Sequence, residues 1–270
     1  MPGVNIMWIE APDIAIAAQP GQFITVRCEG LTLRRPFSIH QVAIVSEASQ
    51  CQVALLFNIV GRGTLWLSQL RRGDRIDILG PLGKGFNIDR EGTNLLLVAG
   101  GIGIAPIVFL AQNTSAQHSV TLIHGANTAA RLCQPQSLPE PVRFVPVTED
   151  GSMGQKGIVT DALPHFLDWA DQIFACGPVD MYRAMADQIV TQGPSLPVIP
   201  RDQNGQTTRV RTGSANDKLK KCQVSLEVRM GCGIGACYAC TVKTKKGPKQ
   251  VCRDGPIFEL DDIIWREVRI

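Results

Sequence analysis

The 270-residue sequence predicts a multi-domain α+β protein: an antiparallel β-barrel, an α/β domain with a parallel sheet, and a small cysteine-rich C-terminal domain. Three observations support this prediction. Short strands separated by turn residues fill the first third of the chain, and strands alternate with helices in the middle. Four of the nine cysteines fall within 21 residues near the C-terminus. We expect domains at residues 1–90, 91–199 and 222–270, with a linker at 200–221.

The barrel prediction rests on alternating apolar and polar residues in short runs. Strands are expected at residues 23–28, 51–60 and 74–79, with the turn signals Pro20-Gly21 and Gly80-Pro81 beside them. One short helix is expected at residues 64–70, with Thr64 as a candidate N-cap and Gly73 beyond its end. Many short strands of this kind are typical of a small antiparallel barrel.

The α/β prediction begins at a continuous apolar run, residues 95–99, which is typical of a parallel strand buried on both faces. Further strands are expected at residues 120–124, 142–147 and 172–176, and helices at 105–112 and 179–191. Residues 200–221 are polar and carry six basic and two acidic side chains, so we expect a solvated linker there, with partner docking as the alternative.

Composition excludes several classes of protein. Hydrophobic residues make up 44% and charged residues 19%, as in ordinary globular chains. A net charge of +3 and 6% aromatic residues give no indication of a nucleic-acid surface. The most apolar stretch, residues 95–111, is short and interrupted by glycine and proline, and the start of the chain lacks a secretory pattern. We expect a cytoplasmic protein that binds neither nucleic acid nor membrane.

The cysteine spacing is the most specific signal. Cys232, Cys237, Cys240 and Cys252 form the pattern C-x4-C-x2-C-x11-C, whose first three members match plant-type [2Fe–2S] ligands. Glycines between them allow the loop to curl around an inorganic core with N–H groups facing the sulfurs. Structural zinc is the alternative, although it usually uses two separated ligand pairs. Four lysines between the third and fourth cysteines indicate a solvated hairpin tip or a docking surface for an electron partner.

Two motifs in the barrel region are candidate nucleotide contacts. Residues 34–39 place a guanidinium and a hydroxyl close together, so that Arg35 and Ser38 could bind a phosphate and a ring edge, while Pro36 excludes a central ladder position. Residues 61–64 precede the expected short helix, and they form either a diphosphate site or a tight turn.

Two further motifs lie at strand ends of the α/β domain. Residues 100–106 follow the apolar strand and open a helix, as a dinucleotide turn does, although Pro106 stands where a third glycine is usual. The next strand ends without an acidic residue, so the sequence does not choose between NAD and NADP. Cys176 ends another strand on the same rim, either as a functional thiol or as a small buried residue.

In this order, the motifs RPFS, GRGT, GGIGIAP and CGP resemble the ferredoxin–NADP reductase superfamily. The C-terminal segments MGCGIGACYACTVKT and VCRDGPIF are similar to the family of electron-transfer subunits of dihydroorotate dehydrogenase B. This resemblance covers nearly the whole chain and implies FAD, a [2Fe–2S] cluster and NAD as cofactors.

The resemblance also assigns site residues. It implies flavin contacts at Arg35, Pro36, Phe37, Ser38, Leu56, Phe57 and Asn58, and diphosphate contacts at Gly63 and Thr64. It implies NAD contacts at Gly100, Gly101, Ile102, Gly103, Cys176, Gly177 and Pro178, and cluster ligation by Cys232, Cys237, Cys240 and Cys252. Asn58 departs from the family, because an arginine or similar group is expected there.

The implied function is electron transfer to NAD⁺ during UMP synthesis. A hydride carries two electrons and a cluster passes one, so FAD belongs between them and no catalytic side chain is nominated. A dihydroorotate-oxidising (β/α)₈ barrel needs about 250 residues by itself, so the resemblance implies a separate FMN-containing subunit in a heterotetramer with two of each.

Other functions remain open at this point. The small subunit of a ferredoxin:NADP transhydrogenase or of a sulfide dehydrogenase-like flavoprotein is the main alternative. Cys232 argues against the transhydrogenase, since that family resembles this chain but has Asp as its first ligand. A plain electron carrier or a zinc-stabilised binding module is the alternative from another class.

Overall fold

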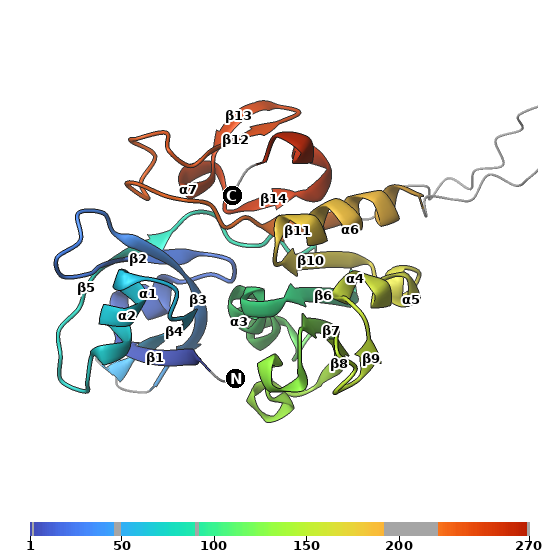
Figure 1. Cartoon of the computed structure of the whole chain (residues 1–270), viewed down its shortest axis with the longest axis horizontal. Coiled ribbons are helices and arrows are strands. Elements are labelled where there is room, and N and C mark those ends of the chain that lie inside the picture. The colour runs from blue at the N-terminus through green and yellow to red at the C-terminus, as the bar shows by residue number, and fades with distance from the viewer. Residues whose placement is uncertain (2, 46–49, 90–91, 192–220, 269–270) are drawn as a thin grey trace, which may run out of the picture.

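The computed structural model describes residues 1, 3–45, 50–89, 92–191 and 221–268. It contains a five-stranded sheet, a seven-stranded sheet and a two-stranded hairpin (Figure 1). The five-stranded sheet lies on the left of Figure 1 and the seven-stranded sheet on the right, with the C-terminal region above both. Within the described ranges, no helix is long and apolar enough to cross a membrane.

The five-stranded sheet is antiparallel throughout, with the order β1-β4-β3-β2-β5. Its strands are β1 (Val4–Glu10), β2 (Phe23–Arg27), β3 (Arg35–Ala43), β4 (Gln52–Asn58) and β5 (Asp77–Leu82), and α1 (Pro12–Ala17) and α2 (Arg62–Gln69) lie between them in sequence. This confirms an antiparallel sheet in the first third of the chain, while its closure into a barrel remains a prediction.

β3 changes partner along its length. Its first half, residues 35–38, pairs with β2, and residues 39–43 pair with β4. Pro36 therefore pairs on one side alone, with Thr25 of β2, as expected for a residue that has no N–H to donate. This divided pairing brings the N-terminal half of β3 and the C-terminal end of β4 to the same edge.

Two local predictions in this region were wrong. The strand expected from residue 74 begins at Asp77, because Asp74 closes a turn: its carboxylate accepts a hydrogen bond from the N–H of Arg71 at 2.7 Å. The helix expected from Thr64 begins at Arg62 with Gly61 as N-cap. Thr64 is the third helical residue, and its hydroxyl accepts a bond from the N–H of Gly61 at 3.1 Å, since a glycine cap has no side chain of its own.

The seven-stranded sheet has the order β14-β11-β10-β6-β7-β8-β9, and only β14 runs antiparallel to its neighbour. Its strands are β6 (Asn94–Gly100), β7 (Ser119–Ala126), β8 (Val142–Thr148), β9 (Gln155–Lys156), β10 (Gln172–Cys176), β11 (Lys221–Ser225) and β14 (Ile257–Glu259). Its helices are α3 (Ile104–Thr114), α4 (Val159–Ala162), α5 (Pro164–Leu167) and α6 (Val179–Thr191). The parallel α/β arrangement is confirmed, with β10 and α6 at the predicted bounds.

The C-terminal region is built into this sheet rather than attached beside it. β11 pairs in parallel with β10, and β14 pairs with β11, so the sheet crosses the boundary expected at residue 222. The remainder is the hairpin β12 (Thr241–Thr244) and β13 (Gly247–Gln250), followed by α7 (Val251–Asp254). Residues 200–220 of the expected linker lie outside the described residues, and Lys221 begins β11.

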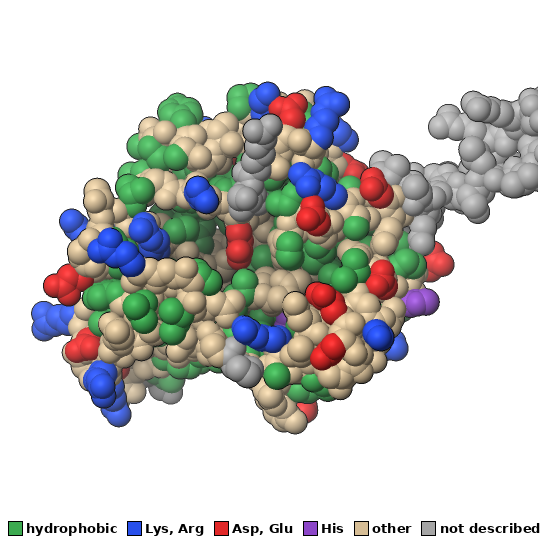
Figure 2. All heavy atoms as spheres, in the orientation of Figure 1, with side chains coloured by type: hydrophobic (Ala, Val, Ile, Leu, Met, Phe, Trp, Pro, Cys, Tyr) green, Lys and Arg blue, Asp and Glu red, His purple; other side chains and the backbone are tan. Residues whose placement is uncertain are grey.

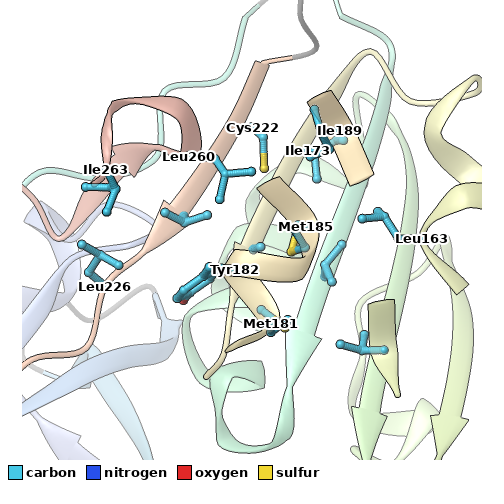
Figure 3. Close-up of a cluster of buried hydrophobic side chains, with 14 of the residues drawn as sticks. Leu163, Ile173, Met181, Tyr182, Met185, Ile189, Cys222, Leu226, Leu260 and Ile263 are labelled. Carbon is cyan, nitrogen blue, oxygen red and sulfur yellow. The ribbon is translucent and has the colours of Figure 1, made fainter. Parts of the chain in front are cut away.

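A buried apolar cluster joins the C-terminal region to α6. Tyr182 and Met185 of α6 pack in one core with Cys222, Leu226 and Leu260 (Figure 3). The Tyr182 hydroxyl also bridges two backbone segments: it donates to the carbonyl oxygen of Ser225 at 2.6 Å and accepts from the N–H of Gly177 at 2.9 Å. This hydroxyl therefore ties the end of β11 to the turn that follows β10.

Candidate functional site

The predicted flavin contacts line one cavity of about 410 Å³. The cavity lies where β3 changes its partner from β2 to β4, beside the end of β4 and the start of α2. Eight of the nine residues assigned to FAD line it: Arg35, Pro36, Phe37, Ser38, Leu56, Phe57, Asn58 and Thr64. The ninth, Gly63, lies beside it, where an added Cβ would come 3.2 Å from Cγ of Arg35. The sequence motifs, which lie far apart in the chain, are thus brought together.

The start of α2 and Arg35 form the charged end of this cavity. The Thr64 hydroxyl is occupied by the chain itself, since it accepts from the N–H groups of Val60 at 2.9 Å and of Gly61 at 3.1 Å. The Arg35 side chain crosses Gly63 and donates to the carbonyl oxygen of Leu33 at 2.9 Å. A guanidinium beside a helix N-terminus suits a diphosphate.

One wall of the cavity was missed by the sequence analysis. Residues 225–230, which run on from the last residue of β11, also line it. The sequence offers one signal for this segment: it ends two residues before Cys232, so it connects the cysteine loop to the preceding strand. It carries Glu227, an exposed residue that lines the cavity, and desolvation by the surrounding protein raises the pKa of its carboxyl.

Two further cavities, of about 630 and 580 Å³, lie on the glycine turn between β6 and α3. Six of the seven residues assigned to NAD line one or both of them: Gly100, Gly101, Ile102, Gly103, Gly177 and Pro178. A Cβ on Gly103 would collide with the carbonyl oxygen of Cys176, so only glycine allows the turn to lie on the end of β10. The two motifs therefore share one rim, as predicted.

The Cys176 side chain does not reach these cavities. It is 0% exposed, lines none of the three cavities, and belongs to an apolar core with Leu56 and Ile104. Burial raises the pKa of its thiol well above the ordinary value. In this structure its backbone carbonyl supports the glycine turn and its thiol packs as an apolar group.

The three cavities meet at a few residues. Ile102 lines all of them, Asn58 lines the 410 and 630 Å³ cavities, and Glu227 lines the 410 and 580 Å³ cavities. The Asn58 Oδ1 atom is buried and has no hydrogen-bond partner in the described part of the chain. A buried acceptor of this kind costs free energy unless a bound molecule satisfies it, which fits a flavin and a nicotinamide meeting here. Figure 2 shows a hollow near the centre of this face.

The larger nucleotide cavity has polar walls that the sequence analysis did not identify. Arg131 follows β7, and Glu149 follows β8. No acidic residue ends β7 itself, but β8 lies beside β7 and the N–H of Glu149 donates to the carbonyl oxygen of Ala126 at 3.1 Å. A carboxylate therefore reaches this rim from the neighbouring strand.

The cysteine loop directs backbone N–H groups at its sulfur atoms. Cys232 Sγ accepts from Ile234 at 3.5 Å, Ala236 at 3.3 Å and Cys237 at 3.4 Å, and Cys252 Sγ accepts from Gly235 at 3.1 Å. Desolvation opposes ionisation of Cys232, but these donors outweigh it and lower the pKa of that thiol to about 6. The loop is built to hold negatively charged sulfur.

The four sulfurs are arranged as two pairs. Cys240 Sγ and Cys252 Sγ are 3.3 Å apart, and the Cys237 thiol is hydrogen-bonded to Cys232. Burial, with the Cys240 thiol beside it, raises the pKa of Cys252 to about 12, so metal binding there releases protons. Two thiolates for each of two irons fit this arrangement better than one tetrahedral zinc does.

The cysteine loop packs against the five-stranded sheet. A Cβ on Gly233 would lie 2.9 Å from Cγ2 of Thr25, and Phe23, two residues earlier on β2, lines the 410 Å³ cavity. Phe23 also lies 4.0 Å from that Cβ position through its Cε2 atom, so a single side chain borders both the loop and the cavity. Of the four lysines on the hairpin, Lys243 pairs with Glu267 and Lys246 with Asp262, each at 2.6 Å, so the lysine cluster is partly neutralised by the chain itself.

Comparisons with known proteins agree with this geometry. Residues 227–264 match the iron-sulfur cluster binding domain of dihydroorotate dehydrogenase B, and residues 97–187 match the oxidoreductase NAD-binding domain. The electron transfer subunit of dihydroorotate dehydrogenase B (NAD(+)) from Desulforamulus reducens is 36% identical, over 98% of this chain and 94% of that protein. The subunit of the same name from Caldanaerobacter subterraneus is 34% identical, over 91% and 87%.

A solved structure with similarity over most of the chain is the NADH-dependent reduced ferredoxin-NADP oxidoreductase. Its TM-score is 0.77 at 28% identity, and the match covers 98% of this chain and 86% of that chain. A ferredoxin reductase of carbazole 1,9a-dioxygenase matches 75% of this chain with a TM-score of 0.61 at 20% identity, which indicates a shared fold.

Proposed function

The chain belongs to the family of electron transfer subunits of dihydroorotate dehydrogenase B, and we propose that its electrons travel from the partner's flavin through the cysteine loop and the 410 Å³ cavity to NAD⁺. It is an NAD-dependent iron–sulfur flavoprotein oxidoreductase subunit that uses FAD, a [2Fe–2S] cluster and NAD. FAD supplies the ability to exchange both single electrons and a hydride, which neither of the other two groups has.

In the proposed assignment, Cys232, Cys237, Cys240 and Cys252 hold the two irons. The N–H groups of residues 234–237 stabilise the negative charge on the sulfurs, and they are fixed in place because Gly233 and Gly235 adopt positive φ values of 75° and 83°. Hydrogen bonds from backbone amides to cluster sulfurs are one of the protein's means of tuning reduction potential.

For FAD, we assign the 410 Å³ cavity to the isoalloxazine ring and the start of α2 to the diphosphate. Arg35 neutralises the phosphates, while Phe37 and Leu56 contribute apolar wall. Asn58 Oδ1 would accept a hydrogen bond from the bound ring system, which would satisfy this buried oxygen. Asn58 thus serves the site in a different way from the arginine expected at this position.

For NAD, the glycine turn at residues 100–103 and the turn at 177–178 receive the dinucleotide in the two cavities beside them. Helix α3 starts at this turn, so its N-terminal end faces the phosphates. Ile102 and Asn58 stand where these cavities open to the flavin cavity, which allows the nicotinamide to approach the flavin. The residues of this chain would orient the nicotinamide and flavin rings, and the two rings would supply the chemistry of hydride transfer.

The finer statements about partners also belong to this proposal. The partner is an FMN-containing catalytic subunit that oxidises dihydroorotate in UMP synthesis, and the assembly is a heterotetramer with two of each subunit. The exposed face of the cysteine loop supports docking there, because Ile234 and Tyr238 are 58% and 67% exposed beside the exposed Cys237. A cytoplasmic location remains a prediction.

The position of the cysteine loop against β2, whose Phe23 lines the flavin cavity, carries the proposed electron route. The test is Cys237→Ser in the complex, with Cys51→Ser as the control, since Cys51 is a buried thiol on another part of the chain. Cys237→Ser should lose the long-wavelength absorption that bleaches with dithionite, and it should lose electron exchange with the partner, while NADH still reduces FAD.

Two results would contradict the proposal. Loss of NADH-dependent flavin reduction in Cys237→Ser with FAD still bound would show that the order of carriers is wrong. Co-purification with a large iron–sulfur flavoprotein, and no dihydroorotate oxidation, would favour a ferredoxin:NADP transhydrogenase subunit, for which the similarity to NADH-dependent reduced ferredoxin-NADP oxidoreductase is the supporting observation.

A further inference from the structure

His124 is a buried histidine with no role in the electron route. It lies on β7, its side chain is 0% exposed, and both of its ring nitrogens are bonded to backbone. Nδ1 lies 3.0 Å from the amide nitrogen of Cys133, and Nε2 lies 3.0 Å from the carbonyl oxygen of Gly101. One imidazole therefore joins two loops that are distant in sequence.

These two bonds determine where the proton lies. A backbone N–H can only donate, so Nδ1 accepts from Cys133 and carries no proton. The proton is on Nε2, which donates to Gly101. A second proton, on Nδ1, would place the N–H of the ring and the N–H of Cys133 facing each other. In agreement, burial lowers the pKa of His124 to about 4, although the bond to Gly101 acts in the opposite direction.

One partner of the imidazole lines the 630 Å³ cavity, and the other ends a segment that lines it. Gly101 lines it directly, and Thr128 and Arg131 line it from the segment that ends at Cys133. Gly101 has a positive φ of 54°, and its carbonyl also accepts from the N–H of Ile104. The His124 bond thus connects this peptide to the segment that forms the opposite wall.

We propose that His124 is a positioning residue for the nicotinamide dinucleotide: its neutral ring fixes the glycine turn and the segment bearing Thr128 and Arg131 at the spacing that the nucleotide requires. The inference rests on the assignment of this cavity to NAD made above. A preformed site spares the nucleotide the cost of ordering the two walls. When the turn is competent for only part of the time, the measured affinity falls in proportion to that fraction.

Two variants separate the two bonds. His124→Asn keeps an acceptor near Nδ1 for Cys133 but is too short to reach Gly101. His124→Gln keeps a donor near the position of Nε2 but offers Cys133 no acceptor. We expect the dissociation constant for NAD⁺ to rise about tenfold in His124→Asn, equivalent to about 1.4 kcal/mol. The increase in His124→Gln should be smaller, because Gly101 lines both nucleotide cavities and Cys133 lines neither.

The matched control is His118→Gln. His118 lies just before β7, and its Nδ1 is 3.0 Å from the carbonyl oxygen of Gly92, so this histidine also bonds a glycine carbonyl, at the opposite end of the strand. Calorimetry with NAD⁺ on the flavin-loaded complex gives each dissociation constant, while flavin content and thermal unfolding report on the fold. The His118→Gln value should stay within about twofold of wild type.

The outcomes are distinguishable. If His124→Asn binds NAD⁺ as tightly as His118→Gln does, His124 does not position the site and the inference is wrong. If the wild-type complex itself binds no NAD⁺, the assignment of the cavity fails as well, and the inference fails with it. A separate rise in KM for NAD⁺ with little change in kcat would support a role in positioning.

Measurements on the wild-type protein test the inference even if the His124 variants do not fold. With ¹⁵N-labelled histidine, the spectrum should show His124 protonated on Nε2, and adding NAD⁺ should shift its signals more than those of His118. The Cys133 amide should exchange its hydrogen more slowly when NAD⁺ is bound. A proton on Nδ1, or no response to NAD⁺, would overturn the inference.

Discussion

Acidification from pH 7 to pH 5 should destabilise this protein through His124. Burial lowers the pKa of this ring from the ordinary 6.5 to about 4 in the folded chain. As the pH falls, the unfolded chain takes up the proton first, so the stability that His124 contributes is present above pH 6.5 and is lost as the pH falls toward 4. At about 1.36 kcal/mol per pKa unit, the full loss is about 3 kcal/mol, of which about 2 kcal/mol falls between pH 7 and pH 5.

The assay compares wild type and His124→Gln by urea unfolding at the two pH values, followed by far-ultraviolet circular dichroism. Groups shared by both proteins, including His40, whose pKa burial also lowers, cancel in the comparison. The free energy of unfolding of the wild type should fall by about 2 kcal/mol more than that of the variant, because glutamine does not titrate. Equal losses would refute the reasoning, since they would mean that the folded ring accepts a proton as readily as the unfolded one.

Three other predictions follow from the same structure. Gly103→Ala should weaken NAD⁺ binding by about tenfold or more with FAD content unchanged, because its Cβ would collide with the Cys176 carbonyl; calorimetry showing wild-type affinity would contradict this close approach. Glu149→Gln should reduce the preference for NADH over NADPH by several-fold in kcat/KM, since a carboxylate on this wall disfavours a 2′-phosphate; an unchanged ratio would assign the preference to other residues. Tyr182→Phe leaves the carbonyl of Ser225 and the N–H of Gly177 without their partner and should cost about 2 kcal/mol. Thermal unfolding would register this as a fall of several degrees, whereas an unaltered transition would mean that water replaces the hydroxyl.

The sequence predicted the functional residues that belong to short local motifs. The cysteine spacing and the glycine turn are short motifs, and each needs only its own loop or its strand–turn–helix context to be recognised. The structure accordingly places Gly100, Gly101 and Gly103 beside two cavities, and it pairs the sulfurs of the predicted ligands. The bounds of β10 and α6 were also predictable, because an apolar run and a helical period mark them clearly.

Residues brought in by tertiary packing were not predictable in this way. Glu227 follows β11 and Glu149 follows β8, two strands whose places in the sheet the sequence does not state. The edge strand β1 was missed, since its Ile6 and Trp8 are exposed and give no burial pattern of the usual kind. Cys176 was placed correctly at a strand end, but which way its thiol points depends on the core behind it.

The insertion of β11 beside β10 limits how this polypeptide can be divided. A fragment ending before Lys221 would leave the backbone edge of β10 unpaired and would remove the acceptor of the Tyr182 hydroxyl, so its nucleotide-binding half would lose support that the iron-binding half provides. Grafting the cysteine region onto another reductase would likewise require a host sheet with a vacant edge in the same register. The two halves are best exchanged, truncated or evolved as one unit.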